Sequence, residues 1–230
     1  ISNLLEQIRD SETRLIHLSI DLVFSGTSGG GHCEWDSPDP VTVYGKTMLL
    51  AEQQVAQSRP EAAILRISLP MGMSYNGHAG AIDWIQNRFQ HNRPATLYYD
   101  EVRTPTYTDC LNRLFEIMIQ NELSGVYHAG GKIRLSLYEI AQIVNRIGGY
   151  DSRWLEGCYR LEAGPLPPRA GNVTLVSEKI TMAVGFEPFT PWPYHDGFLP
   201  THRDWHKERT KAIPGSPEFL AETSVSYTHL

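Results

Sequence analysis

Two kinds of side chain in this sequence could do chemistry: a tyrosine at a predicted helix start and arginines in predicted turns. Tyr44 lies at the start of the helical segment Val43–Ala56. A tyrosine can donate a proton when its surroundings lower its pKa from about 10 towards neutrality. Arg103 precedes Thr-Pro and Arg169 follows two prolines, and a guanidinium held in a turn suits bidentate binding of phosphate. These residues predict a proton donor and an anion-binding site.

Each of these residues also has an ordinary structural interpretation. Tyr44 could be an aromatic residue that only packs at a helix start. Arg66, Arg103 and Arg169 could be surface residues or members of internal ion pairs. The elements around them are therefore needed to choose between the two interpretations.

A strand–helix–strand pattern surrounds Tyr44. Residues 14–19 are rich in β-forming side chains and predict a strand buried on both faces. A loop of Gly, Ser, Pro and acidic residues covers 27–40, the helix follows, and 62–68 predicts a second buried strand. This order is typical of a parallel sheet, whose active sites lie at the carboxyl ends of the strands. The site is therefore expected where these two strands end.

The other predicted elements follow from apolar spacing and from turn and capping residues. They are helices over 1–10, 83–90, 106–122, 136–147 and 177–184, and strands over 95–99 and 125–129. From Tyr150 onward Pro and Gly become dense, and we expect short strands and irregular chain there.

Several segments of the sequence match one enzyme family in order. Residues 18–26 read Leu-Ser-Ile-Asp-Leu-Val-Phe-Ser-Gly, and residues 44–48 read Tyr-Gly-Lys-Thr-Met. They resemble the Ser-Thr-Asp-Tyr-Val-Phe strand end and the Tyr-Gly-x-Thr-Lys helix start of extended short-chain dehydrogenase/reductases, above all the dTDP-4-dehydrorhamnose reductase group. Further similar segments are 65–72, 103–109, 125–128, 136–139 and 168–172. A match in the same order over 1–204 is more specific than any one motif.

The resemblance implies an NAD(P)-dependent reductase of a nucleotide-linked keto-sugar. In that family the tyrosine gives a proton to the carbonyl oxygen as hydride reaches the carbon. A lysine four residues later lowers the pKa of the tyrosine and holds the nicotinamide ribose, and a threonine hydroxyl helps to hold the carbonyl. The matching positions here are Tyr44, Met48 for the lysine and Ile20 for the threonine.

Two of these three catalytic positions depart from the family. An ammonium about 4 Å from the tyrosine is worth roughly 4 kcal/mol, or about 3 pKa units. Met48 supplies no such charge and Ile20 no hydroxyl, so we expect impaired reduction. Lys46 lies about 200° around the helix from Tyr44 and could replace the lysine only if the helix started late. Ser19 could supply a hydroxyl, but strand alternation directs it to the opposite face from Ile20.

The resemblance also assigns binding residues. Ser19, Ser68 and Leu69 match positions that bind the cofactor, which is NADP or NAD in the full-length family members. Arg103, Thr104 and Arg169 match positions that bind the nucleotide-sugar. The sequence has no Gly-x-Gly-x-x-Gly after a strand, and Gly29-Gly30-Gly31 has the spacing of a flexible loop. We therefore expect this chain alone to bind no cofactor.

The expected fold is α/β, the C-terminal part of a doubly wound, Rossmann-type parallel sheet with a smaller substrate-binding domain. Residues 1–100 would form a partial dinucleotide-binding domain without its first strands and phosphate loop. Residues 101–210 would form a sugar-nucleotide-binding region interleaved with the sheet. Residues 211–230 would be a tail, whose last seven residues match no family element and are interpreted as an artefact.

Composition narrows the range of partners. A net charge of -6 gives no reason to expect nucleic acid, and no apolar run reaches the roughly 20 residues that cross a membrane. The three cysteines are scattered, and His202 and His206 lack a third ligand, so no metal site is expected. The predicted location is cytoplasmic, the partner is a nucleotide-sugar, and a homodimer is considered. The alternative function is a non-catalytic sugar-nucleotide-binding or regulatory protein on the same scaffold.

Overall fold

A parallel sheet forms the centre of the computed structural model, which describes residues 1–72, 80–190 and 192. Its strands are β1 (Ile16–Ile20), β2 (Ala63–Ile67) and β7 (Gly125–Ala129), in the order β1-β2-β7. Both pairings are parallel, with Leu18 opposite Leu65 and Leu65 opposite Tyr127. The expectation of a parallel α/β sheet is confirmed.

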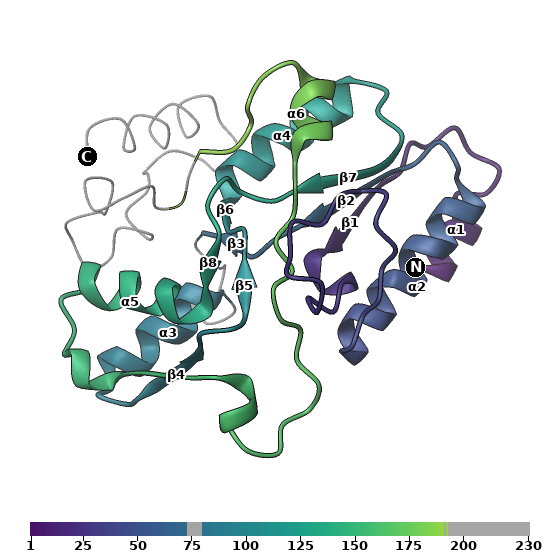
Figure 1. Ribbon diagram of the computed structural model, residues 1–230. Helices are drawn as coiled ribbons and strands as arrows, with labels where there is room; N and C mark the ends of the chain where they lie inside the picture. Colours follow the sequence, from purple (N-terminus) through teal and green to yellow (C-terminus); the bar gives the residue numbers. More distant parts are fainter. Residues whose placement is uncertain (73–79, 191, 193–230) are drawn as a thin grey trace.

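Helices cover both faces of this sheet (Figure 1). On one face lie α1 (Ser2–Gln7) and α2 (Val43–Ser58), and on the other lie α4 (Thr108–Gln120) and α6 (Glu178–Val184). Alternate residues of β2 serve the two faces: Ile64 belongs to a core cluster with Leu5 and Val55, and Leu65 to one with Leu114 and Ile180. Burial on both faces accounts for the largely apolar sequence of β2. The same expectation for the strand at 14–19 is wrong, because Leu18 of β1 is 43% exposed.

A second part of the molecule lies beside the sheet (Figure 1). There β4 (Ala95–Tyr98) pairs in parallel with β9 (Leu155–Cys158), and α3 (Ala81–Gln90) and α5 (Leu137–Ile147) pack together with β4 in one hydrophobic core. Two short ladders stand between the parts. They are β3 (Pro70–Met71) with β6 (Thr106–Tyr107), and β5 (Val102–Arg103) with β8 (Leu135–Ser136).

The segment that leads into α6 returns from the second part to the sheet (Figure 1). Asn172 forms a bridge with Val102, and Leu175 forms one with His32. Val173 and Leu175 also pack in a cluster with Val23 and Phe24, just beyond the end of β1. Chain segments far apart in sequence therefore meet at the carboxyl end of β1.

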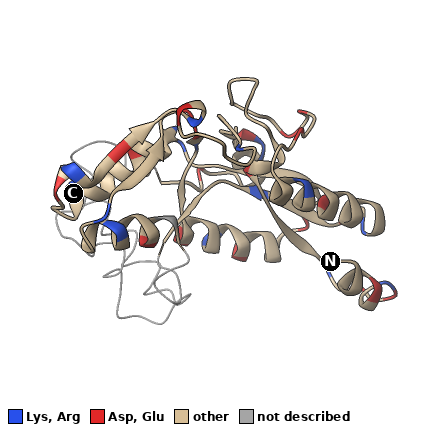
Figure 2. Ribbon diagram, turned by 90° about the horizontal axis from the view of Figure 1, so that it is seen from below, with Lys and Arg blue, Asp and Glu red and all other residues tan. Residues whose placement is uncertain are grey.

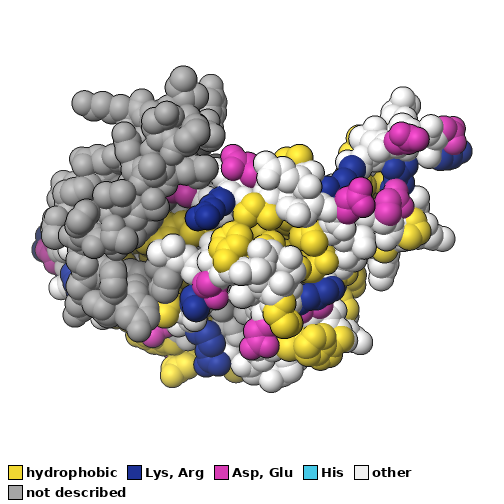
Figure 3. All heavy atoms as spheres, turned by 90° about the horizontal axis from the view of Figure 1, so that it is seen from above, with side chains coloured by type: hydrophobic (Ala, Val, Ile, Leu, Met, Phe, Trp, Pro, Cys, Tyr) yellow, Lys and Arg dark blue, Asp and Glu magenta, His cyan; other side chains and the backbone are white. Residues whose placement is uncertain are grey.

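The predicted elements that fall on described residues are present with small changes at their ends. None of the helices in the described ranges is long and apolar enough to cross a membrane. Acidic and basic residues are interspersed along the helices (Figure 2), and apolar side chains appear among charged ones on the face in Figure 3. The tail 211–230, His202 and His206 lie outside the described residues, and the division into 1–100 and 101–210 stays a prediction.

Candidate functional site

Tyr44 lies in the first turn of α2, beside the 3-10 turn Asp21–Val23 that follows β1. Thr42 caps the helix, and its hydroxyl oxygen accepts a hydrogen bond from the Gly45 amide at 2.9 Å. A Cβ on Gly45 would lie 2.1 Å from the Leu22 carbonyl oxygen, so only glycine lets the helix start approach this turn. The Tyr44 side chain is 57% exposed and can reach a ligand.

Ile20 and Met48 both pack against one hydrophobic cluster. Its buried members are Val23, Phe24, Ala170, Val173 and Leu175. Both side chains are half-buried. The positions that the resemblance assigns to a hydroxyl and an ammonium are thus occupied by side chains that contribute to packing.

Lys46 does not meet the condition under which it could replace the missing lysine. The helix begins at Val43, and the Lys46 amide already donates to the Thr42 carbonyl at 3.0 Å. Lys46 is exposed and lies about 200° around the helix from Tyr44. The early helix start therefore favours a site without a cation next to Tyr44.

The serines expected to bind the cofactor are fully buried. Ser68 donates to Asp21 Oδ2 at 2.7 Å and accepts from the Thr104 amide at 3.1 Å. The hydroxyl of Ser19 has no hydrogen-bond partner among the described residues. Leu69 is half-buried and packs against the core of the second part. Neither serine is therefore exposed to solvent, and the cofactor-binding role of Ser19, Ser68 and Leu69 stays a prediction.

Arg103 is a buried arginine with internal partners. Its Nη1 donates to the carbonyl oxygens of Val102 and Gly171, both at 3.0 Å. Its Nε lies 3.6 Å from Asp21 Oδ2, and its Nη2 lies 3.6 Å from Glu101 Oε2. Burial raises the pKa of Asp21, and the charge of Arg103 opposes that rise. This geometry favours the ion-pair interpretation of Arg103 over direct phosphate binding.

Thr104 is also buried. Its hydroxyl oxygen accepts a hydrogen bond from the Leu175 amide at 3.2 Å. Arg103 and Thr104 therefore both hydrogen-bond to the segment that returns to the sheet, and they hold it next to β5.

Arg169 keeps part of its guanidinium exposed. Its Nε and Nη2 both donate to the Glu101 carboxylate, the second at 3.1 Å. The guanidinium carbon lies 4.8 Å from the centre of the Tyr98 ring. The Arg169 side chain is 42% exposed, whereas that of Glu101 is 2% exposed. The hydrogen bond to Glu101 raises the pKa of Arg169, so the guanidinium stays protonated.

No motif in the sequence pointed to Asp100, Glu101 and Arg160. Arg160 donates from its amide and Nε to Asp100 at 3.0 and 2.9 Å, and from Nη1 to the Arg169 carbonyl at 2.7 Å. Asp100 thus pairs with Arg160, and Glu101 pairs with Arg169 and Arg103. The adjacency of Asp100 and Glu101 just before the segment that contains Arg103 was the one available signal.

A second buried polar cluster lies between β2, β7 and α2. Arg66 donates to both oxygens of Glu52, at 3.0 and 2.7 Å, and its Nη1 lies 3.3 Å from His128 Nε2. Nδ1 of His128 lies 3.0 Å from the His32 carbonyl oxygen, which can only accept. His128 therefore carries its proton on Nδ1 and accepts from Arg66. Burial, with the charge of Arg66, lowers the pKa of His128 to about 3.

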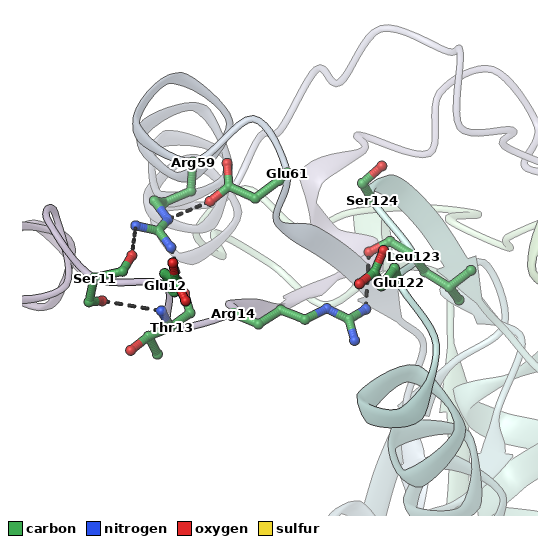
Figure 4. A pocket seen from close by; sticks show the side chains of 9 residues that line it. All are labelled: Ser11, Glu12, Thr13, Arg14, Arg59, Glu61, Glu122, Leu123 and Ser124. Carbon is green, nitrogen blue, oxygen red and sulfur yellow. Dashed lines mark hydrogen bonds and ion pairs between the residues drawn. The ribbon is translucent and has the colours of Figure 1, made fainter.

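A cavity of about 540 Å³ lies at the opposite end of the sheet, before the strands begin (Figure 4). Its two arginines donate hydrogen bonds to backbone carbonyl oxygens of neighbouring segments. Arg59 donates to the carbonyl oxygens of Ile8, Ser11 and Thr13 at 2.9, 3.1 and 2.6 Å. Arg14 donates to the Ile119 carbonyl at 3.1 Å. These contacts indicate a structural role for the cavity lining. Across the described ranges, no cluster of His, Cys, Asp and Glu could hold a metal ion.

The chain is similar to known proteins in sequence and in fold. A family model described as the RmlD substrate binding domain matches residues 1–195. Methionine adenosyltransferase 2 subunit beta of Danio rerio is 27% identical over 198 residues, which cover 79% of this chain and 61% of the relative. dTDP-4-dehydrorhamnose reductase of Mycolicibacterium smegmatis is 26% identical over 194 residues, covering 83% of this chain and 58% of the relative.

A solved structure agrees with the fold. The dTDP-4-dehydrorhamnose reductase of Bacillus anthracis, in complex with NADP, has a TM-score of 0.70 at 22% identity, covering 78% of this chain and 62% of that one. The chain thus spans less than two thirds of the length of each of these relatives. The family model nevertheless covers most of the chain. The chain belongs to the RmlD substrate binding domain family.

Proposed function

We propose that this chain carries the nucleotide-sugar side of an NAD(P)-dependent keto-sugar reductase in which reduction is impaired. The observation that carries this proposal is the packing of Ile20 and Met48 against one hydrophobic cluster. Family membership supports the scaffold and the substrate class.

The impairment follows from what surrounds Tyr44. NAD(P)H supplies a hydride when it is bound, and the carbonyl oxygen must then receive a proton. Tyr44 is exposed enough to approach that oxygen. Met48 gives no positive charge to favour loss of the tyrosine proton, and Ile20 gives no hydroxyl to hold the carbonyl. Positioned acid–base catalysis contributes typically about 10²–10⁴-fold, so its weakening leaves a slow enzyme.

The binding half of the proposed function rests on Arg169. Glu101 occupies Nε and Nη2 of this arginine, and Nη1 has no hydrogen-bond partner among the described residues. A diphosphate oxygen can accept from that edge in a charge-assisted hydrogen bond, worth about 1.5–3 kcal/mol. Arg103 and Thr104 would support the same site indirectly, because they hydrogen-bond to Gly171 and Leu175 of the segment that follows Arg169.

The same packing also favours a second candidate, a non-catalytic sugar-nucleotide-binding or regulatory protein. A relative of this chain is named as a subunit of methionine adenosyltransferase 2. The two candidates share the nucleotide-sugar site and differ in turnover. Measured reduction of a dTDP-4-keto-6-deoxy sugar by the natural protein with NADPH would favour the first candidate. Binding without turnover would favour the second.

A calorimetric titration with dTDP tests the shared part of the proposal. The natural protein that contains this chain should bind dTDP, and Arg169→Ala should weaken binding about tenfold or more, since 1.4 kcal/mol is a factor of ten. Arg153→Ala is the matched control, because Arg153 is exposed and pairs with Asp151 away from the site. Unchanged affinity in Arg169→Ala would move the site elsewhere.

A further inference from the structure

Glu101 is almost fully buried, yet it holds the most exposed charge of the site. It is 1% exposed and lies between β4 and β5. Its carboxylate accepts two hydrogen bonds from Arg169 and lies 3.6 Å from Nη2 of Arg103. Glu101 thus joins a buried guanidinium to an exposed one.

These contacts extend into a row of alternating charges. Asp21, at the end of β1, lies 3.6 Å from Arg103, and Arg103, Glu101 and Arg169 follow in turn. The first three residues are between 1% and 7% exposed. Removal of any one buried member would leave the charge of its neighbour buried without a partner, which is strongly destabilising. The folded state therefore favours the arrangement in which all these charges are paired. The outermost charge of the row, on Arg169, is positive.

The contacts of Arg169 leave one defined edge of its guanidinium open. Glu101 takes the edge formed by Nε and Nη2, and the ring of Tyr98 lies 4.8 Å from the guanidinium carbon. The opposite edge, formed by Nη1 and the second hydrogen of Nη2, matches a second bidentate acceptor such as phosphate. A guanidinium fixed in advance also loses less conformational entropy on binding.

We propose that Glu101 is a positioning residue for the nucleotide-sugar site, which orients Arg169 so that its open edge receives a phosphate of the ligand. This inference rests on the proposed function of Arg169 and adds a residue that does not touch the ligand. It predicts that the charge of Glu101 matters for binding only while Arg169 is present.

A double-mutant cycle with dTDP as the titrated probe tests this coupling. In the natural protein, Glu101→Gln keeps the size of the side chain and removes its charge and one of its two acceptors. We expect about tenfold weaker dTDP binding in Glu101→Gln and no further loss when Glu101→Gln is added to Arg169→Ala. Glu156→Gln is the control, since Glu156 is an exposed carboxylate of β9 that accepts only from Thr96 among the described residues.

A second variant covers the case in which Glu101→Gln fails to fold. Arg169→Lys keeps the charge but lacks the planar fork that Glu101 can hold, so its affinity should fall close to that of Arg169→Ala. Wild-type affinity in Arg169→Lys, or an equal loss from Glu101→Gln with and without Arg169, would overturn the inference. Unchanged binding in Glu101→Gln alone would overturn it too and leave the Arg169 site standing. Absence of dTDP binding by the unmodified protein would overturn both proposals.

Discussion

Met48 and Ile20 provide packing at the two positions that the resemblance assigns to a lysine and a threonine. Met48 lies one helical turn after Tyr44, and its half-buried side chain packs against the cluster around Phe24. Methionine adapts readily to such irregular surroundings. The helix start, its Thr42 cap and the close approach of Gly45 remain in place. The local scaffold around Tyr44 is therefore in place, and we propose that its acid–base chemistry is weakened.

His128 gives a prediction at the residue scale. Its pKa is about 3 in the folded chain against 6.5 as the ordinary value, so the unfolded state binds more protons between these pH values. The free energy of unfolding should fall as pH drops from about 6.5 towards 3, with His128 contributing about 2 kcal/mol of loss between pH 7 and 5.

Urea unfolding at pH 7 and 5 measures this contribution. His128→Gln retains an acceptor for Arg66 and does not titrate, so its unfolding free energy should depend less on pH. His17 and His32, whose pKa values are also lowered mainly by burial, should account for part of the remaining dependence. An identical pH dependence in the variant and the unmodified chain would contradict this assignment.

Among the elements, those with their own local signal could be predicted. The apolar run at 14–19 became β1 (Ile16–Ile20), and the helix predicted over 136–147 is α5 (Leu137–Ile147) with a capping box at Ser136. The two-residue strands, such as β5 (Val102–Arg103), escaped prediction. Such short strands form because they pair with segments far away in the sequence. Two residues are too few to show the alternation of apolar and polar side chains that predicts a strand.

Arg59 gives a prediction at the scale of elements. It follows α2 and donates to three carbonyl oxygens of the connection from α1 to β1. Arg59→Ala should lower the free energy of unfolding by about 2–4 kcal/mol, because charged donors to several carbonyls are lost at once. Glu61→Ala is the control: Glu61 pairs with the same arginine, but its side chain is 58% exposed, so about 1 kcal/mol or less is expected. Equal losses in the two variants would show that the carbonyl contacts do not matter.

In the whole molecule, the candidate site lies where the sheet and the second part meet. The row of Asp21, Arg103, Glu101 and Arg169 crosses from the end of β1 to the returning segment. Arg103 and Arg169 could be predicted from the sequence as candidates for phosphate binding, but the sequence does not show which of them is buried. Glu101 and Arg169 are 68 residues apart, and only the assembled fold brings them together. Tyr44 was recognised through a local motif, whereas the pairing of each arginine depends on tertiary structure.

The central claim is that the chain retains a nucleotide-sugar site and has lost the charge that activates Tyr44. The most direct measurement is the rate of NADPH-dependent reduction of a dTDP-4-keto-6-deoxy sugar by the natural protein containing this chain. The unmodified protein is compared with Met48→Lys plus Ile20→Thr, and with a Lys46→Met plus Met48→Lys exchange that keeps the net charge constant. Thermal unfolding confirms that each variant is folded.

Both variants should raise turnover, the first by about 100-fold or more, since each places an ammonium one helical turn from Tyr44. Lys46→Met alone should change nothing, because Lys46 lies on another side of the helix. Ordinary enzyme rates in the unmodified protein, or loss of its activity in Lys46→Met, would contradict the account.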